Sequence, residues 1–403
     1  ANDYIKKYKK KKISKDLALR IYTTHLLGSE KKLVLHGGGN TSLKETQKDI
    51  FNKMTNVMHV KGSGWDMSNL TEEGMPTVFL DPLIKTLKFQ NMTDNNMVNF
   101  LRNNLLNSSS PNPSVETLLH AFLPHKYIDH THSNAILSLV NLENSNTILK
   151  KIFGNKLAIV PYVMPGFDLA KICYQIYNKD KKVEGLLLLN HGIFTFAATA
   201  EDSYNRMIKY VTLAENYIKK CKLKSKKIYL INKKNNNFDI GKLQNQLRKI
   251  YFNTTKTKWI IKHNGNKDDI LLSNLKNLKK MFDKGPVTPD HVIRIKSKPL
   301  IIESIINKKD NFIENSIMKY VSEYKKYFLK YKNTIKNAKI SDPLPRIIIV
   351  PNLGYFSIGL TQKEEKISND IFLSMKESII DSNYVSTFKS INQKEIFKME
   401  YWP

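Results

Sequence analysis

The feature that most constrains the fold is a strand–turn–strand–helix pattern in the middle of the chain. Gly185–Leu189 is a short apolar run of the length of a buried strand, and Asn190-His191-Gly192 ends it at a turn. A second strand is predicted over Ile193–Ala197, followed by an amphipathic helix over Ala200–Lys220. The apolar run is the best candidate for a membrane span, yet it falls far short of the roughly 20 residues that a spanning helix needs. The sequence therefore predicts packed strands here and no membrane helix.

A similar pattern recurs near the end of the chain. Strands are predicted over Ile347–Val350 and Tyr355–Ile358, followed by a helix over about residues 363–380. His191 has no counterpart in this second segment. Two interpretations stay open: a degenerate repeat that binds no metal, or two independent uses of a common hairpin–helix arrangement.

The remaining pattern predicts further helices and strands and a division of the chain. Lys222–Asn237 is dominated by Lys and Asn and is interpreted as a surface connection between domains. The predicted parts are residues 1–222, a connection over 223–237, and residues 238–403. The other predictions are helices over 15–28 and 114–122, strands over 32–35 and 57–60, and a helix or strand over 135–140.

Composition sets the class of protein. Of the 403 residues, 41% are hydrophobic and 25% are charged, as in soluble globular proteins. Lys and Arg number 65 against 36 Asp and Glu, a formal charge of +29. Such an excess is typical of nucleic-acid binding, but Arg, whose planar fork suits phosphate, is scarce, and Lys is spread along the whole chain. We therefore expect a compositional bias and no specific nucleic-acid partner.

Two further features concern the compartment. Cys173 and Cys221 stand alone, without the spacing of a metal or redox motif, and are interpreted as ordinary thiols in a reducing environment, hence the cytoplasm. The basic stretch Lys6–Lys12 is not followed by an apolar segment, so no signal peptide is expected.

Three histidines form the clearest candidate for chemistry. His130 and His132 are separated by one residue, so in an extended segment both side chains lie on the same side. His191 lies in the turn after a buried strand. Three His ligands with an open fourth position hold a catalytic Zn²⁺ in many enzymes. The alternative is that all three are satisfied histidines of the core or surface.

A carboxylate and two glycine-rich loops complete the candidate site. Glu116 lies at the start of the helix predicted over 114–122, four residues before His120; spacing alone favours an ordinary first-turn acid over an acid/base group. Glycines let backbone N–H groups converge on an anion, and Ser and Thr add donors. Each loop alone could equally be a tight turn. The loops are Gly37-Gly38-Gly39-Asn40-Thr41-Ser42 and Lys61-Gly62-Ser63-Gly64.

Taken together, in this order, the motifs resemble the class II aldolase/adducin family. The narrower resemblance, over nearly the whole chain, is to the aldolase half of bifunctional aldolase/short-chain dehydrogenases. It rests on Leu35–Ser42, Glu116–Pro124, Asp129–His132, Gly285–His291 and Tyr401-Trp402-Pro403. The dehydrogenase half of those proteins has no counterpart in this sequence, so a fused or separate dehydrogenase partner is expected from the resemblance alone.

The resemblance implies roles for individual residues. His130, His132 and His191 match the metal ligands, and Glu116 matches the catalytic carboxylate. The family's phosphate-binding positions match Asn40, Thr41, Ser63, Gly64 and Ser114. Val115 departs from the pattern, because the sugar-phosphate aldolases often have a second Ser there. No residue, Tyr162 included, matches the family's catalytic tyrosine, and the role of His291 is open.

The resemblance also implies a fold and a reaction. The fold is α/β, with three layers around a mostly antiparallel central sheet and a C-terminal α/β extension. The reaction is Zn²⁺-dependent cleavage of a ketose 1-phosphate of the rhamnulose or fuculose type to dihydroxyacetone phosphate and an aldehyde, in a cytoplasmic homo-oligomer. The alternatives are a sugar-phosphate epimerase of the same superfamily and a non-catalytic, adducin-like binding module.

Overall fold

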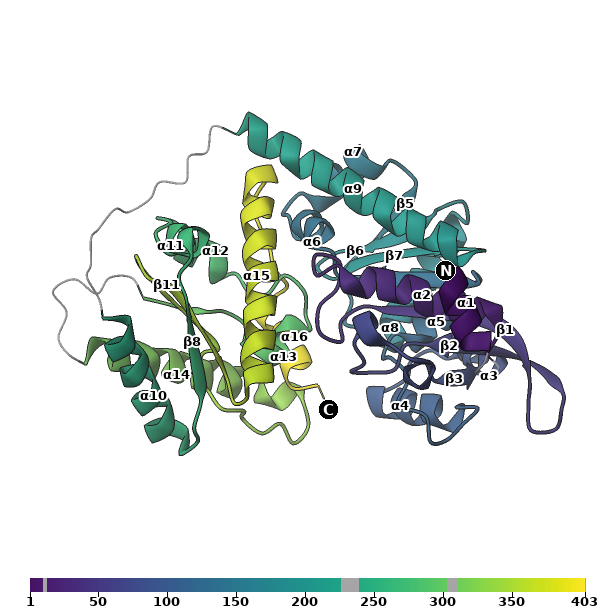
Figure 1. Cartoon of the computed structure of the whole chain (residues 1–403), viewed down its shortest axis with the longest axis horizontal. Helices are drawn as coiled ribbons and strands as arrows, with labels where there is room; N and C mark the ends of the chain where they lie inside the picture. The colour runs from purple at the N-terminus through teal and green to yellow at the C-terminus, as the bar shows by residue number, and fades with distance from the viewer. Residues whose placement is uncertain (10–12, 226–238, 303–310, 403) are drawn as a thin grey trace. The chain divides into compact units, whose positions relative to one another are not determined.

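The structure is a computed structural model of the chain, and it describes residues 1–9, 13–225, 239–302 and 311–402 (Figure 1). The chain forms two compact units, Ala1–Lys220 and Cys221–Pro403. Most of the connection expected over 223–237 lies outside the described residues, and its first two residues belong to a helix. Within the part of the chain that the structure describes, no helix combines the length and apolarity needed to cross a bilayer.

The first unit is built on a seven-stranded sheet of order β3-β2-β1-β4-β7-β6-β5. Every neighbouring pair is antiparallel except β5 and β6. The mostly antiparallel central sheet expected from the family resemblance is therefore confirmed. The strands are β1 Asn40–Lys48, β2 Met54–Val60, β3 Thr77–Phe79, β4 Tyr127–Thr131, β5 Leu157–Val160, β6 Gly185–Leu188 and β7 Gly192–Ala197.

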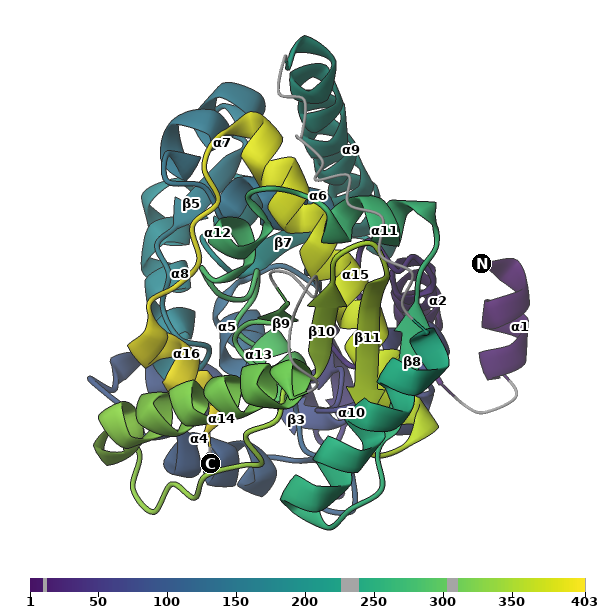
Figure 2. The same cartoon turned by 90° about the vertical axis from the view of Figure 1, so that its left-hand side faces the viewer.

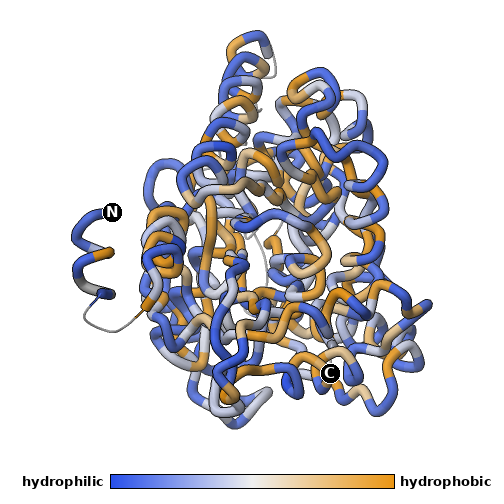
Figure 3. The backbone as a smooth tube through the Cα atoms, turned by 90° about the vertical axis from the view of Figure 1, so that its right-hand side faces the viewer, coloured by the Kyte–Doolittle hydropathy of each residue, from blue (hydrophilic) through white to orange (hydrophobic). Residues whose placement is uncertain are grey.

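Helices cover both faces of this sheet and give three layers. Alternation along the strands sends Leu43 and Tyr127 to the face covered by α2, while Ile128 and Phe194 pack on the other face, with α3, α5 and α8. The long α9, at the top of Figure 3, alternates between hydrophobic and hydrophilic residues, as an amphipathic helix does. The helices are α1 Asn2–Lys9, α2 Lys15–Ser29, α3 Leu80–Lys85, α4 Asp94–Asn103, α5 Thr117–Phe122, α6 Asn134–Val140, α7 Ser145–Phe153, α8 Phe167–Lys179 and α9 Ala200–Lys224.

Three of the predicted elements differ in the structure. The strand predicted over 32–35 is wrong: the backbone N–H groups of Leu33 and Val34 both donate to the carbonyl of Glu30, which folds the segment into a turn after α2. Asn40, expected in a loop, begins β1, and the helix expected from Ser114 begins at Thr117. The ambiguous segment 135–140 is helical, within α6.

The second unit is a smaller α/β layer structure (Figure 2). Its four strands have the order β8-β11-β10-β9, with α10 and α14 packed on one face and α15 on the other. The C-terminal α/β extension is therefore confirmed. Its elements are α10 Ile240–Thr255, β8 Ile260–Asn264, α11 Lys267–Ser273, α12 Leu278–Phe282, α13 His291–Ile295, β9 Leu300–Ile301, α14 Phe312–Tyr331, β10 Ile347–Val350, β11 Gly354–Gly359, α15 Gln362–Val385 and α16 Gln393–Glu400.

The two sheets share a topology that supports the repeat interpretation. In each unit a hairpin (β6–β7 or β10–β11) has a parallel strand on one side and an antiparallel strand on the other. The register is also shared, because His130 lies opposite Phe194 across β4 and β7, and His263 lies opposite Phe356 across β8 and β11. An unrelated hairpin–helix arrangement would not require this agreement in the flanking strands.

The second copy lacks the other two candidate ligands. Counting along the shared register, Gly265 stands where His132 does, and Leu353 stands where His191 does. The Nε2 atom of His263 lies 2.7 Å from the carbonyl oxygen of Leu353, so this ring bonds to backbone. Among the residues that the structure describes, the group that could hold a metal ion therefore lies in the first copy.

Candidate metal centre

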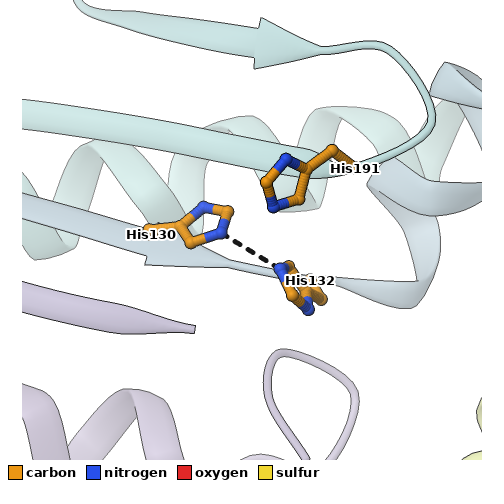
Figure 4. Close-up of side chains that lie close together, drawn as sticks. All are labelled: His130, His132 and His191. Carbon is orange, nitrogen blue, oxygen red and sulfur yellow. Dashed lines mark hydrogen bonds between the residues drawn. The ribbon is translucent and has the colours of Figure 1, made fainter. Parts of the chain in front are cut away.

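The three candidate ligands converge at one end of the first sheet. Each of His130, His132 and His191 offers a ring nitrogen, and these nitrogens all lie within 4.8 Å of one another. Figure 4 shows His130, on β4, and His132, directly after the end of β4, facing the turn between β6 and β7, which carries the third ring. The i,i+2 spacing and the strand-end turn thus bring the residues together as the sequence predicted.

Local packing orients the central ring. The Nδ1 atom of His130 lies 3.0 Å from the carbonyl oxygen of Ile193, to which it donates, so Nε2 is the nitrogen that faces the other histidines. The ring also stacks on Phe194, with centroids 4.0 Å apart and planes 10° apart. Gly192 leaves room for this arrangement, because a Cβ atom there would lie 2.5 Å from the carbonyl oxygen of Thr131.

The donor set fits a divalent cation. Tetrahedral Zn²⁺ with Zn–N distances of about 2.0–2.1 Å requires ligand nitrogens about 3.3 Å apart. The Nε2 atoms of His130 and His132 are 3.0 Å apart, so this pair of rings needs only small rotations to reach that separation. Two imidazole nitrogens that face each other so closely form an arrangement that a bound cation stabilises.

Glu116 lies against the histidine cluster. Its Oε2 atom is 3.3 Å from Nε2 of His130, and its Oε1 atom is 3.3 Å from Nε2 of His191. The residue is only 5% exposed. Sequence spacing alone favoured an ordinary first-turn acid, but the tertiary structure places the carboxylate next to two candidate ligands, where it can exchange a proton with a bound molecule.

Asn40 is committed to this carboxylate. Its Nδ2 atom donates to Oε2 of Glu116 at 2.7 Å and to the hydroxyl of Ser114 at 3.0 Å, while its Oδ1 atom lies 2.5 Å from Nε2 of His120. The strand register explains the placement, because Asn40 on β1 lies directly opposite His130 on β4. A phosphate contact from this side chain would require one of these bonds to break.

The two glycine-rich loops lie side by side. A Cβ atom on Gly37 would be 3.4 Å from the carbonyl oxygen of Gly64. Lys61 joins the loops, because its Nζ atom donates to the carbonyl oxygens of Gly37 at 2.9 Å and Trp65 at 2.7 Å. Burial lowers the pKa of this lysine to about 8. The sequence placed Lys61 at the start of the second loop but gave no sign that its side chain is buried and bonded to the first loop.

The other predicted anion-binding residues are divided. Ser63 and Gly64 are exposed at the tip of their loop, where they can meet a ligand. The hydroxyl of Thr41 lies 2.7 Å from that of Thr24, in the interior on the α2 side of the sheet. Strand alternation separates Thr41 from Asn40 in this way, so the side chain of Thr41 does not join the site.

A buried ion pair supports β4 from behind the metal centre. Asp129 points away from the histidine face, and its Oδ1 atom lies 2.5 Å from Nη2 of Arg20, with both side chains fully buried. Its second carboxylate oxygen accepts a hydrogen bond of 2.6 Å from Ser203 on α9. The sequence held one signal for this pair: an acid that alternates with two candidate ligands on a buried strand must find a partner on the opposite face.

Cys173 is not among the residues of this site. Cys173 is buried in the hydrophobic core, and burial raises the pKa of its thiol, so it stays protonated. This agrees with its interpretation as an ordinary core thiol.

Comparison with known proteins places the chain in a family. Residues 19–218 match the class II aldolase and adducin N-terminal domain, and residues 240–403 match the second domain of class II aldolases. An uncharacterized oxidoreductase of Bacillus subtilis, YuxG, is 30% identical over 395 residues, which cover 95% of this chain and 56% of that protein. The chain thus spans about half the length of this curated relative.

Two solved structures are similar to about half of the chain. The N-terminal class II aldolase domain of a conserved Thermoplasma acidophilum protein is 39% identical, with 51% of this chain and 95% of that one covered and a TM-score of 0.49. The l-fuculose-1-phosphate aldolase of Thermus thermophilus is 13% identical, with 53% and 97% covered and a TM-score of 0.35. Because the two family models together match most of the chain, the protein belongs to the class II aldolase and adducin family.

Proposed function

We propose that the protein is a metal-dependent aldolase that cleaves a ketose 1-phosphate of the rhamnulose or fuculose type to dihydroxyacetone phosphate and an aldehyde. One observation carries the proposal: three histidine nitrogens lie within 4.8 Å of one another, and the carboxylate of Glu116 lies 3.3 Å from two of the rings. A trio of neutral ligands with an adjacent acid/base group suits cleavage next to a carbonyl.

The residues divide the work as follows. His130, His132 and His191 would hold a Zn²⁺ or similar ion. Such an ion acts as a Lewis acid that stabilises negative charge on the oxygens of the ketose fragment. As the carbon–carbon bond breaks, the hydroxyl on the departing carbon gives its proton to the carboxylate of Glu116 and becomes the aldehyde, while the bonding pair stays on the carbon of the ketose fragment. That ketose carbon then takes up the proton from Glu116, whose Oε atoms are the groups in place for both transfers.

A non-catalytic, adducin-like role is the rival from another class. A binding module has no need for a complete ligand set, whereas all three histidines and the carboxylate are present and together here. An epimerase would use the same cleavage and rejoin the fragments, so only product analysis separates it from the aldolase. A phosphorylated substrate is part of the proposal: Ser63 and Gly64 would meet the phosphate, and Val115, which packs against the core, supplies no hydroxyl.

The relative's printed name adds a proposal about partners. YuxG is named an oxidoreductase, and 56% of its length matches this chain. We propose that an oxidoreductase activity resides in the unmatched part of that relative, and that a short-chain dehydrogenase, fused or separate, acts on a product of the present reaction. Assembly into a homo-oligomer, with the cytoplasm as its location, belongs to the same proposal.

A retro-aldol screen tests the function. Purified, zinc-loaded protein is offered ketose 1-phosphates of differing stereochemistry and the same sugars without phosphate, and dihydroxyacetone phosphate is detected with a coupled NADH-dependent reductase. We expect release from at least one phosphorylated ketose, and none from a His132→Ala variant. Release of only the epimeric sugar would favour the epimerase. Equal KM values with and without phosphate would remove the phosphate from the proposal, and metal-loaded protein without activity on any ketose would refute it.

A further inference from the structure

Four buried side chains form a hydrogen-bonded series that leads from the strand β1 to the candidate acid/base group. The hydroxyl of Ser42 lies 2.7 Å from Nδ1 of His120, and Nε2 of His120 lies 2.5 Å from Oδ1 of Asn40. Nδ2 of Asn40 in turn lies 2.7 Å from Oε2 of Glu116. Ser42 and His120 are fully buried, and Asn40 and Glu116 are 4% and 5% exposed.

Hydrogen-bond chemistry determines which group donates and which accepts in each bond of this series. An ionised Glu116 only accepts, so Asn40 must present its NH₂ group to the carboxylate and its oxygen to His120. His120 must then donate from Nε2, and its Nδ1 atom accepts from the hydroxyl of Ser42. Burial lowers the pKa of His120 well below its ordinary value, so the ring is neutral and carries the single proton that this assignment needs.

The backbone holds the residues of this series in place. Ser42 and Asn40 are two residues apart on β1 and therefore share a face of the sheet. The backbone N–H of His120 donates to the carbonyl of Glu116 at 3.1 Å, which joins the two through one turn. Lys44 on the same strand donates to the carbonyl oxygens of His120 at 2.6 Å and His125 at 3.1 Å, and so secures the end of α5.

His120 lies behind the site and does not face a substrate. Its ring is fully buried, and Asn40 stands between it and the carboxylate. The edge of its ring packs against Phe194, with centroids 5.5 Å apart, and the same phenyl ring stacks on His130. The hydrogen-bonded route from the His120 ring to the carboxylate therefore passes through Asn40.

We propose that His120 is a positioning residue: by donating from Nε2 to Asn40, it locks the amide in the one orientation that directs its NH₂ group to Glu116 and holds that carboxylate against the candidate metal ligands. The inference rests on the proposed function, in which Glu116 is the acid/base group. It also gives Asn40 a role in catalysis in place of the phosphate contact expected from the family resemblance.

Two substitutions at one position separate the positioning role from simple packing. The amide nitrogen of Gln reaches the place of Nε2, so His120→Gln keeps the donor to Asn40 and loses the bond to Ser42. Asn is shorter, so His120→Asn keeps a partner for Ser42 and loses the donor to Asn40. Both variants lose the aromatic contact with Phe194 alike.

The expected result is a difference in kcat. Losing a hydrogen bond that orients a charged group costs roughly 10- to 100-fold, so we expect His120→Asn to lower kcat by that factor with KM little changed. His120→Gln should stay close to wild type, and metal content should be the same in both. His59→Asn is the matched control. His59 is also buried and bonded through both ring nitrogens, to Glu45 and Thr77, but it does not belong to the hydrogen-bonded series that leads to Glu116. Equal losses in the two His120 variants, or no loss in either, would overturn the proposal.

A spectroscopic measurement keeps this inference distinct from the proposed function. In protein labelled with ¹⁵N-histidine, long-range ¹H–¹⁵N spectra report which ring nitrogen carries the proton, with no need for turnover. We expect His120, identified by its shift in Ser42→Ala, to be the neutral Nε2–H tautomer. If the wild type cleaves no ketose phosphate, the proposed function fails, but the tautomer of His120 still tests the proposed arrangement of hydrogen bonds. An Nδ1–H tautomer or a charged ring would overturn it.

Discussion

Breaking the buried ion pair behind the metal centre is the sharpest test of how the fold supports the site. Asp129→Asn keeps the shape of the side chain and its bond from Ser203 but leaves the guanidinium of Arg20 buried without its countercharge. Both side chains have no exposed surface, so water cannot take the place of the lost partner. Removing one member of such a pair costs about 3–5 kcal/mol.

This cost translates into a large fall in melting temperature. For a unit of this size, 1 kcal/mol shifts the midpoint by about 2–4 °C, so we expect a fall of about 6–20 °C. A second ion pair provides the control: Lys126 and Asp16 are also 2.5 Å apart, but their side chains are 41% and 38% exposed. Asp16→Asn should cost at most about 1 kcal/mol, because solvent screens the pair. Because both ion pairs have the same separation, burial and not distance explains why breaking the first pair costs more stability than breaking the second.

Unfolding of the metal-free protein in urea measures both variants without the contribution of a bound ion. Trp65 reports on the first unit when Trp259 and Trp402 are replaced by Phe. The double variant Arg20→Met/Asp129→Asn removes both charges and should be less destabilised than the two single variants added together, by about 2 kcal/mol or more. Additivity within about 0.5 kcal/mol, or equal losses in Asp129→Asn and Asp16→Asn, would refute the reasoning.

Three further predictions follow from the same geometry. His132→Ala should lose one bound metal ion per chain by elemental analysis, and His263→Ala should lose none, because the second copy lacks the other two ligands; retained metal in the first variant would contradict the ligand assignment. Glu116→Gln should keep the metal and the fold and lower kcat by on the order of 100-fold or more; near-normal turnover would exclude an acid/base role. Burial lowers the pKa of Lys44 to about 7, so the unfolded chain binds the extra proton between that pH and about 10.4, and stability should rise with pH across this window. Lys44→Met should flatten that rise, and an unchanged slope would show that the lysine titrates normally in the folded protein.

Much of the fold could be predicted from local patterns. The hairpin over residues 185–197 and its later counterpart were predicted because short apolar runs separated by Gly-containing turns have few other structures. The same local reasoning gave the wrong structure for residues 32–35. Leu33 and Val34 are buried there, as in a strand, but their N–H groups bond to the end of α2 and not to a neighbouring strand. Apolar character predicts burial more securely than it predicts pairing.

The sequence could predict the arrangement of the metal ligands better than it could predict the residues that surround them. His130 and His132 share a face because the strand repeats every two residues, and this rule is local to the chain. The bond from Asn40 to Glu116 joins residues 76 positions apart. The bond from Arg20 to the carbonyl of Ile128, on the same strand as His130, joins residues 108 positions apart. The sequence by itself therefore determined which residue types stand ready for a metal and which of them point the same way. Only the tertiary structure decided which carboxylate meets them and which donors aim it, because strand register and helix packing set those distances and no local spacing encodes them.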